Sequence, residues 1–159
     1  MTQVASKAIK RTWGPAIAAS AMLGLAQKIP GIPLEGMFCL KFARLCIENA
    51  LNLAPGGFYR LVTGVDGNPS ARELEHLLRT QKPAWVVSSV KEIQVGDTVW
   101  WKDLPPQWGH VGIIVLYRAK WYVAQNTIER FKGIDYPGAL RLIPLEQMPV
   151  PSSIIRIGG

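Results

Sequence analysis

The chain has 159 residues, of which 48% are hydrophobic and 18% are charged. This length favours one domain with a sizeable core, and the composition excludes an intrinsically disordered chain. The formal net charge is +7, which favours anionic partners such as nucleic acid, anionic lipid or a bacterial cell wall. Because the basic residues are scattered, with no run of five like charges, a solvated basic surface is the simpler interpretation.

The N-terminal third predicts two helices. Residues 1–12 are polar, and the Ala-, Leu- and Met-rich segment 15–28 predicts a helix with Pro15 in its first turn. The apolar run 13–26 follows basic residues, as in a signal peptide. No clean cleavage site follows it, so we favour a helix packed on the domain, and the run is too short to span a bilayer. A second helix is predicted over 35–52, where apolar residues recur at helical spacing.

The middle of the chain predicts a loop, a helix and a short strand. Turn signals rich in glycine and proline predict a loop over 52–67. Asn68 and Pro69 suit the N-cap and the first position of a helix that continues through ARELEHLLRTQ. A short strand is predicted over 85–87.

After residue 95 the pattern changes to strands. A tight turn at Gly96–Asp97 introduces the first of them, and a proline-rich loop over 103–108 precedes the second. The predicted strands cover 98–101, 111–117, 120–126, 140–143 and 154–157. We therefore expect an α+β fold, with N-terminal helices packed on an antiparallel sheet of about five or six short strands. We expect a single domain over 1–159, in which residues 1–14 could be flexible.

The two cysteines differ in their expected environment. In one helix Cys39 and Cys46, seven positions apart, are separated by about 10 Å of rise, which is too far for a disulfide. Cys39 lies near the start of its predicted helix, where the helix dipole favours a thiolate and free N–H groups can stabilise an oxyanion. Cys46 lies two turns further on and is expected to be buried and structural. The spacing does not predict a metal site.

A thiol nucleophile needs a base, and His110 is the candidate. It precedes an apolar strand and follows a proline-rich loop, whereas His76 lies within a helical pattern and is expected on its surface. A third polar residue would fix the imidazole tautomer. If the strands after His110 form a hairpin, Asn126 returns close to it, and Gln125 remains the alternative because the register cannot be read from sequence.

Three stretches together resemble the NlpC-type and CHAP-type papain-like cysteine peptidases of bacteria and their phages. They are FCLKFARLCIENAL, VGDTVWWKDLPPQWGHVGIIV and WYVAQNT. The resemblance covers roughly residues 16–145, and the Gly-Asp turn followed by Gly-His-Val-Gly-Ile is its most specific part. It implies a papain-like fold in which Cys39 is the nucleophile, His110 the base and Asn126 the orienting residue.

The resemblance also implies a substrate and a place of action. The family suggests an endopeptidase or amidase that cleaves peptidoglycan, such as a phage lysin, with no metal and no cofactor. Such a protein acts at the bacterial cell wall after secretion, phage delivery or incorporation into a virion, and a larger assembly could target it there. We expect Trp101, Trp108 and Tyr122 to line the cleft, and Trp100 to pack in the core.

The chain departs from the family pattern at two places. Phe38 and Leu40 flank Cys39, where many NlpC-type members carry an acidic or amide residue and Ser-Gly, and Ala124 stands where CHAP-type members often carry Glu. These departures keep open a degenerate wall-binding or structural virion protein. A basic nucleic-acid-binding domain is a second alternative, which the scattered charge does not favour. A hydrolase of proteins or small molecules is a third.

Overall fold

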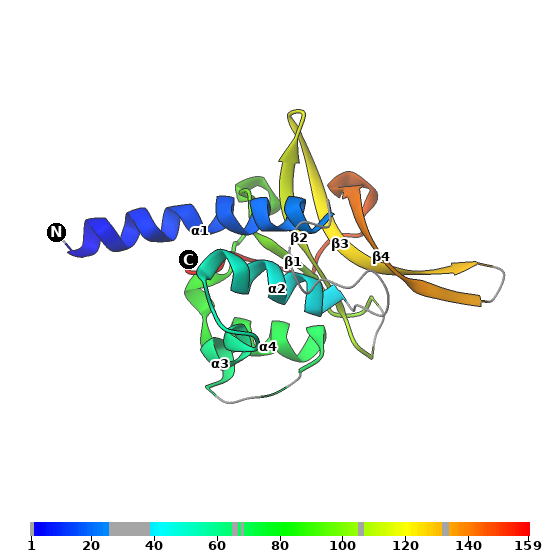
Figure 1. The fold of residues 1–159 in the computed structure, drawn as a ribbon, viewed down its shortest axis with the longest axis horizontal. Helices are drawn as coiled ribbons and strands as arrows, with labels where there is room; N and C mark the ends of the chain where they lie inside the picture. The colour runs from blue at the N-terminus through cyan, green and yellow to red at the C-terminus, as the bar shows by residue number, and fades with distance from the viewer. Residues whose placement is uncertain (1, 26–38, 65–66, 68, 105–106, 132–133) are drawn as a thin grey trace.

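The computed structural model describes residues 2–25, 39–64, 67, 69–104, 107–131 and 134–159. It shows an α+β fold with four α-helices and a five-stranded antiparallel sheet (Figure 1). The helices are α1 (Thr2–Leu25), α2 (Cys39–Leu51), α3 (Gly57–Thr63) and α4 (Ala71–Gln81). The strands are β1 (Thr98–Trp101), β2 (His110–Tyr117), β3 (Lys120–Phe131), β4 (Ile134–Pro144) and β5 (Ser153–Ile155). The expected α+β class is therefore confirmed.

The sheet has the strand order β4-β3-β2-β1-β5, so β2 lies at its centre. The predicted hairpin of β2 and β3 is confirmed, with Tyr117 opposite Lys120 beside the turn. Arg118 and Ala119 form that turn, and both have positive φ, as a tight two-residue hairpin connection requires. On its other side β2 pairs with β1, where His110 lies opposite Trp101.

The sheet buries both of its faces. The larger core lies between the sheet and all four helices and contains alternate residues of the central strands, including Val111, Ile113 and Ala124. The smaller core, on the opposite face, contains Trp101 and Ile114 together with loop residues that cover them. Two covered faces explain why β2 reads as a continuous apolar run.

Several sequence-based boundaries were wrong. Helix α1 begins at Thr2 and contains Pro15 in its interior, where we expected Pro15 in the first turn. Helix α3 lies inside the segment that we expected to be a loop, since its N-cap, Gly56, belongs to a stretch that was read as a turn signal. The N-cap of α4 is Ser70, whose Oγ accepts a hydrogen bond from the Glu73 N–H, not Asn68.

The segment 83–87 also differs from expectation. Pro83–Trp85 forms a short 3-10 turn, and only Val86 bridges to a strand, opposite Ile155. The strands β3 and β4 are longer than predicted: β3 continues to Phe131, and β4 begins at Ile134. The backbone of Thr2–Gly14, within the segment that we expected could be flexible, belongs to helix α1.

Helix α1 packs tightly on the turn that introduces β1. A Cβ atom on Gly14 would lie 2.5 Å from the Val95 carbonyl oxygen, and one on Gly96 would lie 1.9 Å from the Gly14 carbonyl oxygen. Gly96 also has φ +86. Asp97 then accepts hydrogen bonds from the Gln94 N–H and from Arg156, at 2.8 Å and 2.8 Å. The Gly-Asp turn thus joins α1, β1 and the C-terminal segment.

Within the described segments, no helix combines the length and apolar character that crossing a bilayer requires. Ile17 and Ala21 of α1 are fully buried in the larger core, which accords with the preferred interpretation of this apolar run as a packed helix.

Candidate active site

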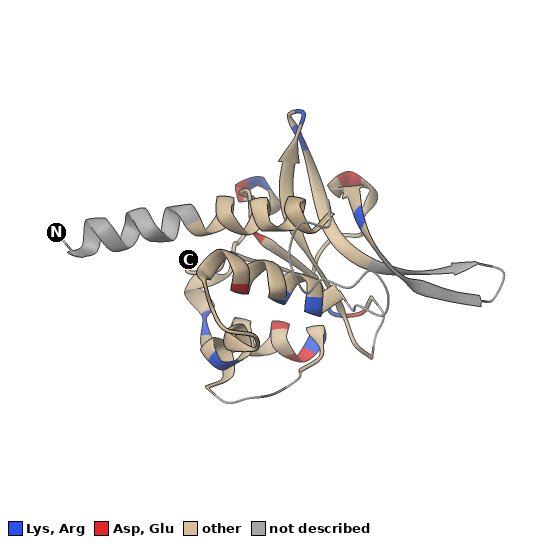
Figure 2. Cartoon of the chain, viewed as in Figure 1, with Lys and Arg blue, Asp and Glu red and all other residues tan. Residues whose placement is uncertain are grey.

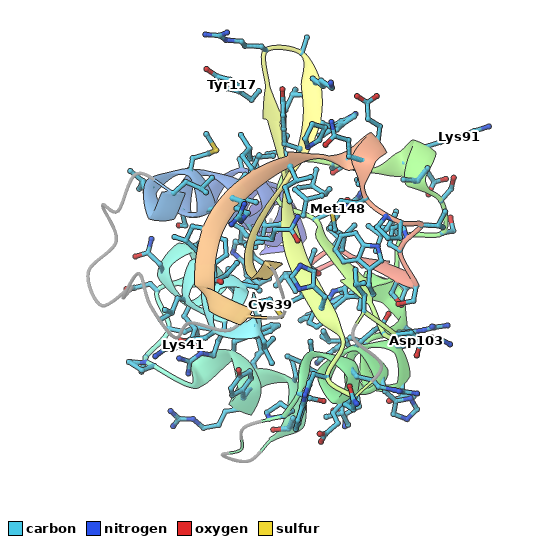
Figure 3. All side chains as sticks on the ribbon, turned by 90° about the vertical axis from the view of Figure 1, so that its right-hand side faces the viewer. Cys39, Lys41, Lys91, Asp103, Tyr117 and Met148 are labelled. Atoms are coloured by element: carbon cyan, nitrogen blue, oxygen red, sulfur yellow. The ribbon has the colours of Figure 1, made fainter. Side chains whose placement is uncertain are left out.

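Cys39 is the first residue of α2, which packs on β2 and β3. Its side chain contacts the larger core and is half-buried. Figure 3 looks onto the end of the sheet, where Cys39 lies near the centre of the view, between Lys41 on one side and Asp103 on the other. The predicted position of Cys39 at the start of a helix is therefore confirmed.

The Cys39 thiol lies against the backbone of β2, next to His110. The ladder between β2 and β3 ends at the pair Ile113 and Ala124. Backbone N–H groups point alternately to the two sides of a strand. The Ile114 N–H donates to the Asp97 carbonyl, directly before β1, so the Val111 N–H points to the other side, toward β3 and beyond the last paired residues. The Val111 N–H is one of the backbone groups that act on the Cys39 thiol and lower its pKa. The thiol is therefore near the backbone of the residue that follows His110.

Burial and hydrogen bonding act on the thiol in opposite directions. Burial raises the pKa of Cys39, and the backbone N–H groups of Val111, Leu40 and Cys39 itself partly offset this by stabilising the thiolate. The Cys46 thiol has a raised pKa from burial alone, with no such donors. The two cysteines therefore differ as expected: only Cys39 has hydrogen-bond donors for a thiolate, and Cys46 lies fully inside the core.

His110 opens β2, and its hydrogen-bond partner is Gln125. The Nε2 atom of His110 meets Oε1 of Gln125, whose Nε2 donates to the Met148 sulfur at 3.4 Å. Because the amide oxygen is an acceptor, the imidazole carries its proton on Nε2 and leaves Nδ1 unprotonated. Burial lowers the pKa of His110, and the bond to Gln125 partly opposes this. The structure thus favours a neutral imidazole whose free nitrogen can accept a proton.

The hydrogen-bond partner of His110 is Gln125, the alternative to Asn126 that the sequence left open. Continuing the register by one pair places Gln125 opposite Gly112, and a Cβ atom on Gly112 would lie 3.4 Å from the Gln125 Cβ. Gln125 and His110 therefore project from the same face of the sheet. Asn126 projects from the other face, with Ala124 of the larger core.

Cys39 and His110 approach the sheet from opposite faces. The His110 ring lies on the side of the smaller core, where its centroid is 5.6 Å from that of Trp101. Within the described residues no hydrogen bond joins the thiol to the imidazole. Catalytic hydrogen bonds of this kind are often long in enzymes without substrate.

The three aromatic residues expected to line a cleft occupy different environments. Trp101 is 3% exposed and donates its indole N–H to the Pro149 carbonyl, so it is a core residue. Tyr122 lies opposite Val115, roughly 16 Å along β2 from His110 by strand rise. Only Trp108, which is 66% exposed and two residues before His110, is available to a substrate near the site. Trp100 is buried, as expected.

Two neighbours of the site were missed by sequence analysis. Tyr59 of α3 interacts electrostatically with Cys39. Burial raises the pKa of the Tyr59 hydroxyl, and the positive charge of Arg44 lowers it. Negative charge on Glu48 or on Cys39 raises this pKa further. The Arg44 guanidinium lies 5.3 Å from the centre of the Tyr59 ring. Met148 holds the amide of Gln125. Neither could have been found, because α3 was read as a loop and Met148 is remote in sequence.

The site resembles no metal centre. Across the part of the chain that the structure describes, no group of three or more His, Cys, Asp or Glu side chains could hold a metal ion. Comparison with known proteins found no matching family model, no similar curated protein and no similar solved structure.

Proposed function

We propose that this chain is a papain-like cysteine hydrolase that cleaves peptide or amide bonds of peptidoglycan. The observation that carries the proposal is the Cys39 thiol at the first turn of a helix that packs on β2, the strand that His110 opens. Gln125 supports it, since an amide that fixes the imidazole tautomer is what a general base needs. The family resemblance supplies the substrate class, and the net charge of +7 suits an anionic wall.

The proposed reaction begins from a neutral thiol and a neutral imidazole, because burial raises the pKa of Cys39 and lowers that of His110. The sulfur attacks the carbonyl carbon as Nδ1 of His110 accepts the thiol proton. The C–N bond of the tetrahedral intermediate then breaks, and His110 gives that proton to the leaving amine. Water, deprotonated by His110, hydrolyses the thioester to a carboxylic acid and restores the thiol.

The remaining residues of the site position His110 and the substrate and stabilise the charges that form during the reaction. Gln125 holds the proton on Nε2 of His110 and stabilises the imidazolium that forms during attack. The backbone N–H groups of Leu40 and Cys39, at the positive end of the α2 dipole, favour the thiolate and the developing oxyanion. Trp108 is exposed beside the site and is suited to contact a sugar or a peptide.

A second candidate is a non-hydrolytic wall-binding or virion protein with the same fold. The observation that favours it is the missing hydrogen bond between the thiol and the imidazole among the described residues, together with the raised pKa of Cys39. The nucleic-acid alternative has less support. Among the coloured residues, Figure 2 shows basic residues on α2, at the tip of the β2–β3 hairpin and near α4, with acidic residues between them rather than one basic stripe.

The test is the loss of turbidity of purified bacterial cell walls, with two matched pairs of variants. We expect Cys39→Ala and His110→Ala to abolish clearing. Cys46→Ala and His76→Ala should retain it, because Cys46 lies in the core and His76 is on the surface of α4. No clearing by the wild type on walls of several species would contradict the proposal. Faster labelling of Cys39 than of Cys46 by a thiol reagent would then point to another substrate, and equal inertness to the degenerate protein.

A further inference from the structure

Asn126 is a buried polar side chain that makes no hydrogen bond within the described part of the chain. It is 2% exposed, and neither its Oδ1 nor its Nδ2 has a partner among the described residues. Burying an unpaired amide is costly, so buried polar groups are nearly always bonded and an exception calls for an explanation. Because Gln125 already bonds His110, orienting the imidazole is not that explanation.

The register places Asn126 on the same face of the sheet as the Cys39 thiol. Continuing the pairing of β2 and β3 beyond Ile113 and Ala124 places Asn126 opposite Val111, whose backbone acts on the pKa of the thiol. Asn126 lies opposite Leu140 of β4, which packs on the larger core, so its side chain is on the same face of the sheet as α2. Cys39, at the start of α2, packs against the same core, so the unpaired amide and the thiol lie on one face beside the same residue of β2.

We propose that the Asn126 Nδ2–H binds the carbonyl oxygen of the substrate and stabilises the negative charge that forms on it when Cys39 attacks. This inference rests on the proposed function, since it requires Cys39 to be the nucleophile. It also assigns Asn126 a different role from the orienting one: an amide donor that is already desolvated and unpaired is preorganised for an oxyanion. Its unpaired state without substrate is the cost of this preorganisation.

Two reactions of the same thiol separate this role from others. Acylation by p-nitrophenyl acetate passes through a tetrahedral oxyanion, in which a C–S bond forms and nitrophenolate leaves. Alkylation by iodoacetamide displaces iodide from carbon and forms no oxyanion. Asn126→Leu keeps nearly the same volume and removes both polar atoms. We expect it to slow acylation of Cys39 by roughly 10²- to 10³-fold and to change alkylation by no more than about twofold.

The thermal midpoint separates the proposed role of Asn126 from a structural one, because the loss of a structural contact would lower that midpoint. Because Asn126→Leu removes two unpaired buried atoms, we expect its thermal midpoint to rise. Ser153→Ala is the matched control: the Ser153 hydroxyl is also buried and unpaired, but it lies on β5, so acylation should not change. Asn126→Ala repeats the test if the leucine does not fit.

The outcomes distinguish this proposal from the proposed function. Equal slowing of acylation and alkylation, or a lower thermal midpoint with unchanged acylation, would overturn the role of Asn126. The selective loss of acylation together with failure to cleave any wall would support Asn126 and count against peptidoglycan as the substrate. A wild-type Cys39 that p-nitrophenyl acetate does not acylate would contradict both.

Discussion

Replacing Gln125 should weaken catalysis through His110 alone. Gln125 is fully buried and makes one hydrogen bond to the imidazole, which becomes charged when it accepts the thiol proton. A hydrogen bond to a charged group contributes about 1.5–3 kcal/mol, and about 1.4 kcal/mol corresponds to a tenfold change in rate. For Gln125→Leu we therefore expect kcat/KM to fall by roughly 10- to 160-fold.

The pH profile tests the direction of this effect. The bond to Gln125 raises the pKa of His110, so its loss lowers that pKa further, and the acid limb of kcat/KM should move to lower pH in Gln125→Leu. In Gln125→Glu a carboxylate beside the imidazole raises the pKa of His110, so the limb should move to higher pH. The two substitutions at one position thus shift the profile in opposite directions.

Met148→Leu is the control for these variants. It removes the sulfur that accepts from the Gln125 amide but leaves the bond to His110 in place, so we expect less than about a threefold loss of kcat/KM. Hydrolysis of a soluble wall peptide over a range of pH measures all three variants. The reasoning is refuted if Gln125→Leu is no slower than Met148→Leu, or if the profiles of the leucine and glutamate variants coincide.

Three further predictions concern stability. Burial lowers the pKa of His110, so the contribution of the neutral imidazole to the free energy of unfolding is complete above about pH 6.5 and is lost as the pH falls toward the pKa of His110 in the folded protein. The thermal midpoint should therefore fall on going to about pH 5, and it should fall less in His110→Phe. Asp97→Ala should lower the free energy of unfolding by about 3 kcal/mol in urea titrations, because it leaves Arg156 without its carboxylate partner. Gly112→Ala should cost about 1–3 kcal/mol, since its Cβ would lie 2.2 Å from Cγ1 of Val123.

The strands were the most predictable part of the fold. The apolar run after His110 and the tight turn before Thr98 predicted β2 and β1 closely, because sheets covered on both faces require continuous apolar segments. Helix α3 was missed because the glycines that cap it, Gly56 and Gly64, are also typical of loops. Trp101 was misplaced because the sequence does not reveal that the second face of the sheet is also covered.

The candidate site was predictable as residue types but not as geometry. Cys39 stood out by its place in a helix and His110 by its place before a strand. The choice between Gln125 and Asn126 depends on a register that differs by one residue, and that register follows from cross-strand packing at Gly112 and Val123. The packing of α2 on β2, which brings the thiol near the backbone of Val111, is a tertiary feature with no local sequence signal.

The most direct test of the central claim is mass spectrometry of the acyl-enzyme. The protein is mixed with a wall peptide, quenched in acid within one turnover and digested. The account predicts an acyl adduct on the peptide that contains Cys39, present in Cys46→Ala and absent in Cys39→Ala. Turnover without any adduct on Cys39, or turnover that survives Cys39→Ala, would contradict it.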